Sequence, residues 1–216
     1  MCCRYYVEST PYFIELGELA LRTTYLSRRK MGDGGSVLHT GEIRPGNTVT
    51  TIMRSRGGKK LAFHMYWGFT AQNRSLIINA RSETAAERPM FKEPWAQQRC
   101  IIPASWYYEW EHFKGPGGVV KTGRKFLIQP AGDDRTFMCA LYRLEEGFPH
   151  FAILTRPPGE KISFIHDRMP LILPESRIDD WIDPSADPAK LAKLALTDME
   201  YALADKQEQL TLGNVG

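Results

Sequence analysis

The chain has 216 residues, of which 43% are apolar and 25% are charged, and its formal net charge is +3. This composition is that of a soluble globular protein of one domain, and it excludes a long disordered or fibrous segment. No apolar run approaches the ~20 residues of a transmembrane helix, and Arg4 and Glu8 stand where a signal peptide would be apolar, so we expect a cytoplasmic protein without membrane contact.

The first half of the chain predicts short strands around one long helix. Residues 4–7 have strand composition, and Pro11 starts a helix of about 12 residues whose apolar face we expect from Ile14, Leu16, Leu19 and Ala20. A glycine-rich loop follows at 30–35 and a turn at Arg44–Asn47. Strands are then expected at 48–53 and 61–67, joined by a hairpin at Gly57 and Gly58.

The second half predicts more strands than helices. A strand is expected at 75–80, and a helix from about residue 85 that Pro89 interrupts. Further strands are expected at 99–103, 106–110, 125–129, 136–142, 150–154 and 171–173, with loops at 114–123 and 165–170 and helical segments at 174–181 and 188–196. About nine strands with few helices predict an α+β fold, in which one domain over residues 1–216 is built on an antiparallel β-sheet that curls into a barrel.

The charge is unevenly distributed along the chain. Residues 178–216 carry eight acids and three lysines, a net −5, which leaves +8 on residues 1–177. Basic residues cluster at 22–30 and 54–60. A positive body of this kind suits a polyanion such as nucleic acid, although solvated surface charge explains the clusters equally well.

The first residues offer an unusual reagent. If Met1 is removed, Cys2 carries a free α-amine beside its thiol, and such a 1,2-aminothiol can condense with an aldehyde to a five-membered thiazolidine. A buried first strand in which Cys2 and Cys3 pack as small hydrophobic residues remains the alternative. The four cysteines include no C-x-x-C pair and, with the histidines, no zinc spacing, so we expect no metal and no cofactor.

Three polar groups stand at the ends of apolar strands. Asn79 and Arg81 are two residues apart and therefore on one side of an extended strand. Glu109 lies among four aromatic residues, where poor solvation would raise the pKa of a carboxyl into the range of a general acid or base. His166 adjoins a carboxylate and a cation in His166-Asp167-Arg168. A turn cap, an edge-strand glutamate and a loop histidine are the plain alternatives for these groups.

Seven motifs in order resemble the SRAP family, the SOS response-associated peptidases that process abasic sites. They are Cys2, Arg44–Gly46, Tyr66–Gly68, Ile78–Thr84, Arg99–Ala104, Tyr107–Trp110 and Ile165–Pro170, with a weaker echo at Leu212–Val215. The resemblance implies covalent capture of abasic sites in single-stranded DNA by Cys2, with lyase-type reversal in the DNA damage response. It also implies an SRAP-like fold, and we expect a monomer.

The resemblance assigns roles to single residues. Asn79 would hold the cysteine and the sugar remnant, Glu109 would handle protons, and His166 would assist ring opening or β-elimination. The remaining matches, all implied DNA contacts, are Arg4, Arg81 and Arg168 at the phosphates and Pro45 and Trp67 at the bases.

The chain departs from the family pattern at three places. Cys3 and Trp106 stand where glycine is usual, and the loop Thr70–Asn73 lacks a second tryptophan. These departures concern DNA contact more than the chemistry at Cys2. Two other functions compete with capture: a thiol peptidase that removes only Met1, and a module that binds single-stranded DNA without a covalent bond.

Overall fold

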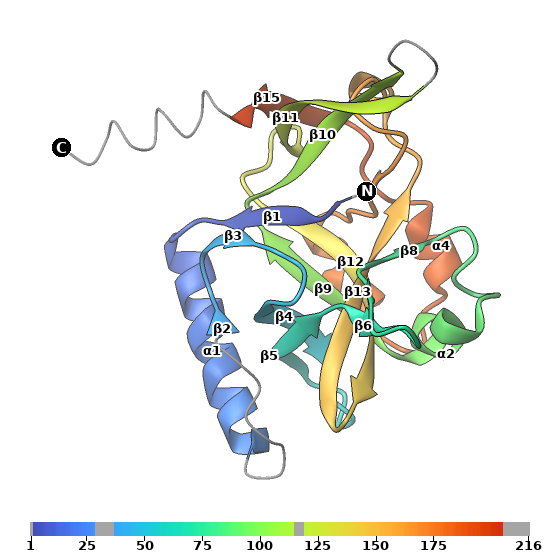
Figure 1. Ribbon diagram of the computed structural model, residues 1–216. Coiled ribbons are helices and arrows are strands. Elements are labelled where there is room, and N and C mark those ends of the chain that lie inside the picture. Colours follow the sequence, from blue (N-terminus) through green and yellow to red (C-terminus); the bar gives the residue numbers. More distant parts are fainter. Residues whose placement is uncertain (1, 29–36, 115–118, 205–216) are drawn as a thin grey trace.

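The computed structural model describes residues 2–28, 37–114 and 119–204 (Figure 1). The expected glycine-rich loop at 30–35, most of the glycines in the loop at 114–123 and the motif Leu212–Val215 lie outside these residues. None of the helices in the described ranges is long and apolar enough to cross a membrane.

The centre of the fold is a closed β-barrel. Its strands, in spatial order, are β12 (Thr136–Glu145), β9 (Arg99–Ala104), β4 (Thr48–Arg54), β5 (Lys60–Trp67) and β13 (Phe148–Arg156). A pairing between β13 and β12 closes the circle. The neighbours are antiparallel except β5 and β13, which are parallel, so the barrel is mixed. The predicted α+β fold with a mainly antiparallel sheet curled into a barrel is confirmed.

Short strands extend the barrel at its rim. Strands β2 (Val37–Leu38), β8 (Asn79–Arg81) and β14 (Met169–Pro170) pair with β4 or β13. Strands β6 (Phe69–Thr70) and β7 (Leu76–Ile77) pair only with each other.

The single strand expected at 75–80 is therefore wrong in part, because the chain changes sheet at Ile78. The carbonyl of Ile78 accepts hydrogen bonds from Trp67 Nε1 at 3.1 Å and from the backbone of Ile153 at 3.0 Å.

A second sheet lies across one end of the barrel (Figure 1). It runs in the order β15 (Met199–Leu203), β11 (Val120–Pro130), β10 (Trp106–Lys114), β1 (Arg4–Val7) and β3 (Gly41–Ile43). Its inner face, toward the barrel, carries fully buried side chains such as those of Tyr5 and Tyr107, and its outer face carries their neighbours in sequence. The two edge strands β3 and β15 were not predicted, because each is short and its sequence shows no strand pattern long enough to recognise.

The barrel wall is apolar on both sides. Along β9, β12 and β13 alternate side chains belong to the barrel interior and to a second core that packs against helices outside. Met138 and Ile153 point inward, while Cys139 and Leu154 point outward, and all four are fully buried. This two-sided burial explains why these strands are continuous apolar runs in the sequence.

Helix α1 (Pro11–Arg28) is longer than the predicted 12 residues and packs on β5 with a different face. Phe13, Gly17, Ala20 and Thr24 are buried, whereas Ile14 and Leu19 are 47% and 46% exposed. Small residues allow a close approach, since a Cβ added at Gly17 would lie 2.8 Å from His39 Nδ1. The expected face was therefore wrong at Ile14 and Leu19. These are large apolar side chains, which the sequence pattern predicts to be buried, but they are exposed.

Three further helices cover the other side of the barrel. Helix α2 (Pro89–Gln97) begins at the proline that was expected to interrupt it, because proline suits the first helical position, where no N–H partner is needed. Helices α3 (Ile178–Trp181) and α4 (Pro188–Ala192) agree with the two predicted helical segments, although α4 is shorter. The predicted strand at 171–173 reduces to a single bridge between Met138 and Ile172.

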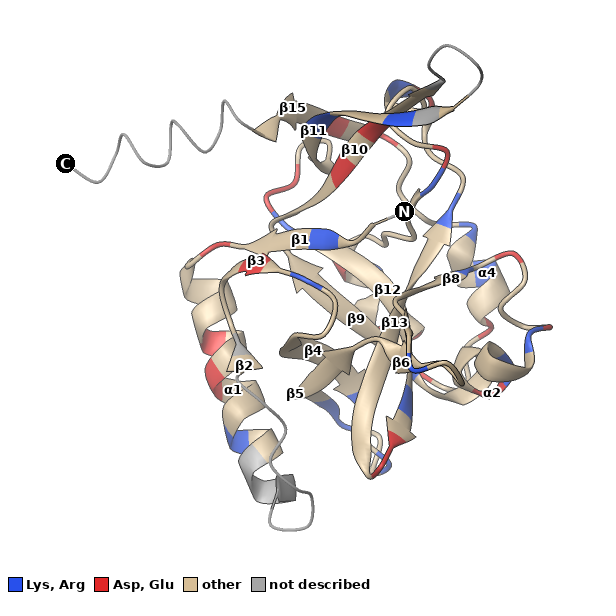
Figure 2. Cartoon of the chain, in the orientation of Figure 1, with Lys and Arg blue, Asp and Glu red and all other residues tan. Residues whose placement is uncertain are grey.

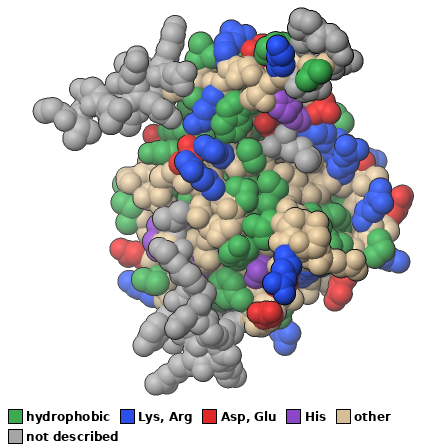
Figure 3. All heavy atoms as spheres, in the orientation of Figure 1, with side chains coloured by type: hydrophobic (Ala, Val, Ile, Leu, Met, Phe, Trp, Pro, Cys, Tyr) green, Lys and Arg blue, Asp and Glu red, His purple; other side chains and the backbone are tan. Residues whose placement is uncertain are grey.

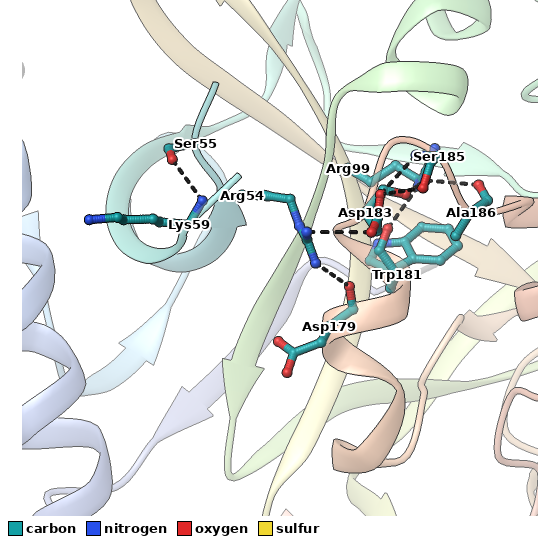
Figure 4. Close-up of polar contacts among 9 residues, drawn as sticks. All are labelled: Arg54, Ser55, Lys59, Arg99, Asp179, Trp181, Asp183, Ser185 and Ala186. Carbon is teal, nitrogen blue, oxygen red and sulfur yellow. Dashed lines mark hydrogen bonds and ion pairs between the residues drawn. The ribbon is translucent and has the colours of Figure 1, made fainter. Parts of the chain in front are cut away.

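The buried guanidinium of Arg99 joins two of these helices to the barrel, and Figure 4 shows its contacts with the chain from Trp181 to Ala186. Its N–H groups donate to five backbone carbonyls: Trp95, Ala96, Trp181, Asp183 and Ala186. Two of these carbonyls belong to the last turn of α2, and that of Trp181 ends α3. Helix C-termini carry partial negative charge, so they satisfy the buried cation without a carboxylate.

Acids of the C-terminal part pair with two residues of one basic cluster, and Figure 4 shows the contacts of the first, Arg54. Arg54 lies 3.4 Å from a carboxylate oxygen of Asp183, and Lys60 lies 2.9 Å from one of Asp179. The cluster at 54–60 is therefore less positive than its sequence suggests. Its partners are acids of residues 178–216, the segment with the negative net charge.

Replacing Arg99 tests whether the five carbonyls around its guanidinium, here called the carbonyl cage, stabilise the fold. Arg99→Met leaves five buried or half-buried carbonyls without their donor, so we expect the free energy of unfolding to fall by about 3 kcal/mol. Urea denaturation measures the change. The control is Arg177→Met, whose exposed guanidinium bonds only to Asp180 at 3.0 Å among the described residues; it should change stability by less than about 0.5 kcal/mol. Equal losses in the two variants would contradict the role of the cage.

Candidate active site

Cys2 belongs to the buried cluster that joins the inner face of the second sheet to the barrel interior. Its side chain has no exposed surface, and its thiol donates to the carbonyl of Arg4 at 3.7 Å. Burial raises the pKa of the Cys2 thiol well above its usual value, and the nearby Glu109 carboxylate raises it further. The side chain therefore rests as a neutral thiol.

Asn79 holds the backbone of Cys2 directly. Its Nδ2 donates to the carbonyl of Cys2 at 2.9 Å, across 77 positions of sequence. Asn79 is brought there by β8, which pairs in parallel with β13 at Ile153. The buried Oδ1 of Asn79 has no hydrogen-bond partner among the described residues, so the amide oxygen can still accept a hydrogen bond.

Glu109 reaches the same place from β10. Strand β1 pairs with β10, with Arg4 opposite Tyr108, so the start of β1 runs beside Glu109. The carboxyl is on the inner face and is 3% exposed. Burial raises its pKa, and the charge of Asp167 acts in the same direction. The expectation of a poorly solvated carboxyl is borne out by this geometry, which moves Glu109 toward the range of a general acid.

His166 lies in the loop that follows the short 3₁₀ turn Glu160–Ile162. Its Nδ1 is 2.7 Å from a carboxylate oxygen of Asp167 and 3.0 Å from the backbone nitrogen of Arg168. Burial lowers the pKa of His166 to about 4. The imidazole is therefore neutral at physiological pH and can act as a base.

His112 is a further histidine that the sequence did not single out. Its ring centroid is 4.5 Å from that of His166, and its backbone nitrogen donates to the carbonyl of Ile165 at 3.0 Å. The loop before His166 is thus bonded to the strand that carries Glu109. No sequence signal could have revealed this contact, because the two histidines are 54 positions apart.

Two of the predicted phosphate-binding arginines are already in ion pairs. Arg168 makes a bidentate pair with Glu83 at 2.6 and 2.8 Å and also donates to the carbonyl of Thr155. Arg4 lies on the outer face of the sheet, over the ring of Trp110, and donates to Glu42 at 3.1 Å. Figure 2 shows the oppositely charged residues of β1 and β3 next to each other.

Arg81 and Pro45 lie at the surface near the same end of the barrel. Arg81 is exposed on β8 and forms no ion pair with other described residues. Pro45 is half-buried in the predicted turn, where Gly46 has a φ of +89° and donates to the carbonyl of Trp67 at 2.9 Å. Both side chains are available to a ligand that covers this end.

Trp67 is placed differently from its predicted role at the DNA bases. Its ring has no exposed surface and packs against Tyr5 at 5.3 Å and Phe151 at 6.0 Å between centroids. Its Nε1 donates a hydrogen bond to the carbonyl of Ile78. In this arrangement the indole forms part of the core beneath Cys2 and offers no face to a base, which corrects the prediction.

The two unusual residues near the site are accommodated without blocking it. Trp106 is on the outer face, stacked on Tyr6 at 4.8 Å with an interplanar angle of 3°. Its side chain therefore points away from Glu109. Cys3 is half-buried, and burial followed by the charge of Glu109 raises the pKa of its thiol.

The described residues contain no group of three or more His, Cys, Asp or Glu side chains that could hold a metal ion. The site consists instead of a thiol, an amide, a carboxyl and an imidazole, which together can bind and transfer protons around an electrophilic carbon.

Comparison with known proteins identifies the family. A sequence model described as SOS response associated peptidase (SRAP) matches residues 1–211. The chain belongs to the SRAP family. Among curated SRAP relatives, the abasic site processing protein YoqW of Bacillus subtilis is 32% identical over 164 residues, which cover 70% of this chain and 70% of YoqW. The abasic site processing protein YedK of Escherichia coli is 31% identical over 127 residues, 55% of this chain and 53% of YedK.

Solved structures share the SRAP-like fold. A phage-related protein from Bordetella bronchiseptica superimposes with a TM-score of 0.67 at 23% identity, covering 94% of each chain. A protein from Bacteroides thetaiotaomicron gives a TM-score of 0.65 at 20% identity, covering 96% of this chain and 94% of that one. At these identities the likeness shows the fold alone.

The low pKa of His166 makes stability depend on pH. Between its usual value of 6.5 and its folded value of about 4, the unfolded chain binds more protons at this residue than the folded chain. We therefore expect the contribution of His166 to stability to be complete above pH 6.5 and to be lost as the pH falls toward 4. Urea midpoints across this range should decrease less in His166→Gln than in the parent. Parallel pH profiles would contradict the assignment.

Proposed function

We propose that this protein captures abasic sites in single-stranded DNA as part of the DNA damage response, and that it does so covalently through Cys2 after removal of Met1. The observation that carries the proposal is the convergence of Asn79 and Glu109 on Cys2. Membership of the SRAP family and the names of YoqW and YedK as abasic site processing proteins support it.

The chemistry begins at the α-amine of Cys2. The amine attacks the C1′ aldehyde of the ring-opened sugar, and the resulting carbinolamine loses water to give an imine. The thiol of Cys2 then adds to the imine carbon, and its proton passes to the imine nitrogen. The products are a thiazolidine and one water, so no metal, cofactor or redox partner is consumed.

Glu109 suits both proton transfers. In its protonated form the carboxyl donates to the hydroxyl that leaves as water, and the carboxylate then accepts the thiol proton for delivery to nitrogen. The raised pKa of Glu109 supports the first role. The raised pKa of Cys2 suits this order of events, because a neutral thiol leaves the amine to react first.

Asn79 and His166 act on the substrate side. The hydrogen bond from Asn79 fixes the Cys2 backbone, and the unused Oδ1 accepts a hydrogen bond from a sugar hydroxyl. His166, neutral above pH about 4, removes the C2′ proton of the imine when the strand is cleaved by β-elimination. This gives the lyase-type reaction that competes with ring closure.

The DNA strand would run across the end of the barrel. Figure 3, in the orientation of Figure 1 with the second sheet above the barrel, shows basic side chains on either side of a central strip of hydrophobic side chains. Arg81 offers an exposed guanidinium to a phosphate, and Arg4 and Arg168 would exchange their carboxylate partners for phosphate oxygens. Pro45 would contact the bases. A monomer suffices for this arrangement.

The test uses a single-stranded oligonucleotide with one abasic site. We expect an adduct that survives denaturing electrophoresis and whose intact mass lacks Met1 and one water. Cys2→Ser should abolish it, because an amine alone forms only a reversible imine. Glu109→Gln should slow its formation by about 100-fold.

Cys3→Ser is the matched control, since it removes the neighbouring thiol and should leave the adduct intact. An adduct that persists in Cys2→Ser and disappears in Cys3→Ser would overturn the proposal. Salt-dependent binding without any adduct would favour the non-covalent alternative, and retention of Met1 in variants of Glu109 or His166 would favour the peptidase alternative.

A further inference from the structure

A single-stranded DNA site needs aromatic faces on which bases stack, and the expected ones are missing here. Trp67 is fully buried, and the loop Thr70–Asn73 carries no aromatic residue. The exposed aromatic residues in the described part of the chain lie elsewhere. They are Phe113, Phe164 and Tyr201, which are 47%, 45% and 46% exposed.

Two of these rings share one buried support. The centroids of Phe164 and Tyr201 are 5.3 Å apart, and each lies 5.7 Å from the centroid of Phe126. Phe126 is 3% exposed, so it is the floor of the cluster. The three rings meet edge to face, which fixes their orientation, and the side chains of Phe164 and Tyr201 remain exposed to solvent.

The cluster adjoins the candidate active site. Phe126 on β11 is the direct cross-strand partner of Glu109 on β10, and both point to the inner face of the sheet. Directly paired residues have Cβ atoms about 5 Å apart. Phe164 is two residues before His166 on the same loop. A nucleotide next to one held at Cys2 and Glu109 is therefore within reach of these rings.

The charges around the cluster indicate which part of a nucleotide it would bind, and they favour the nucleobase over the phosphate. Arg124 lies over Phe126 at 5.3 Å, but its guanidinium makes two 3.0 Å bonds to Glu111. Lys161 is paired with Asp198 at 2.6 Å. Each of these two cations is balanced by a carboxylate, so the exposed aromatic rings are what distinguishes this surface, and an aromatic ring suits any nucleobase.

We propose that Phe164 and Tyr201 form a stacking platform for an unpaired nucleobase that flanks the abasic nucleotide. The platform would supply the base stacking that neither the buried Trp67 nor the loop Thr70–Asn73 can provide. This inference rests on the proposed function, and it assigns to β15 and to the loop before His166 a part in positioning the strand.

The test measures binding rather than reaction. The DNA carries a tetrahydrofuran abasic analogue, which has no aldehyde, and fluorescence anisotropy gives Kd. The variants are Phe164→Leu and Tyr201→Leu, because leucine keeps an apolar contact with Phe126 but has no aromatic face. Leu144→Ala, on β12 and 53% exposed, is the control. Thermal unfolding checks that each variant is folded.

We expect each leucine variant to bind about tenfold more weakly than the parent, whereas the control binds like the parent. The loss should shrink below about twofold when the flanking nucleotide on one side, 5′ or 3′, also lacks its base, because the platform then has nothing to stack on. The ratio between parent and variant should be the same at low and high salt, since no phosphate contact is removed. Phe164→Trp should retain full affinity.

Failure of this inference is distinguishable from failure of the proposed function. If the parent binds the DNA and both leucine variants bind equally well, the platform is wrong while capture by Cys2 stands. If the variants lose affinity equally with and without flanking bases, the rings act on something other than a base, and the inference is again overturned. If the parent binds no single-stranded DNA, both proposals fail together.

Discussion

The pairing of β1 with β10 is the contact on which the rest of the site depends. It carries Cys2 to the side of Glu109, more than a hundred positions away in sequence, and it sets Tyr5 and Tyr107 on one inner face above the barrel. The hydrogen bond from Asn79 then fixes the carbonyl of Cys2, which lies just before β1 begins. Without this sheet the thiol of Cys2 would be an ordinary exposed group.

Burial gives the three ionisable groups of the site their chemical character. The same removal from water raises the pKa of Cys2 and Glu109 and lowers that of His166. Each group is therefore held toward its neutral form, in which it can give or take a proton as charge develops. The barrel supplies this environment because its closed wall and the sheet across its end exclude water. The helices outside it, tied to β9 by Arg99, support the wall from the other side.

Much of the fold could be predicted from the sequence. The long β-branched and apolar runs became barrel strands, and the seven motifs gave the family and therefore the architecture. The failures have physical causes. The edge strands β3 and β15 gain their structure only from partners distant in sequence, and α1 packs through Gly17 and Ala20 because a small side chain permits close approach. Pro89 opens a helix rather than breaking one because of its place in the helix.

By itself, the sequence determined which chemical groups this protein has and the family in which they occur: an N-terminal thiol, an amide, a carboxyl among aromatic residues and an imidazole. Tertiary structure decided which of them meet and in what state. In the folded chain Trp67 is buried, whereas Phe164 and Tyr201 are exposed. Arg168 is paired with Glu83, and the ring of His112 lies against that of His166. Local sequence fixes neither solvent exposure nor long-range contact, because both depend on how strands far apart in the chain pair and close.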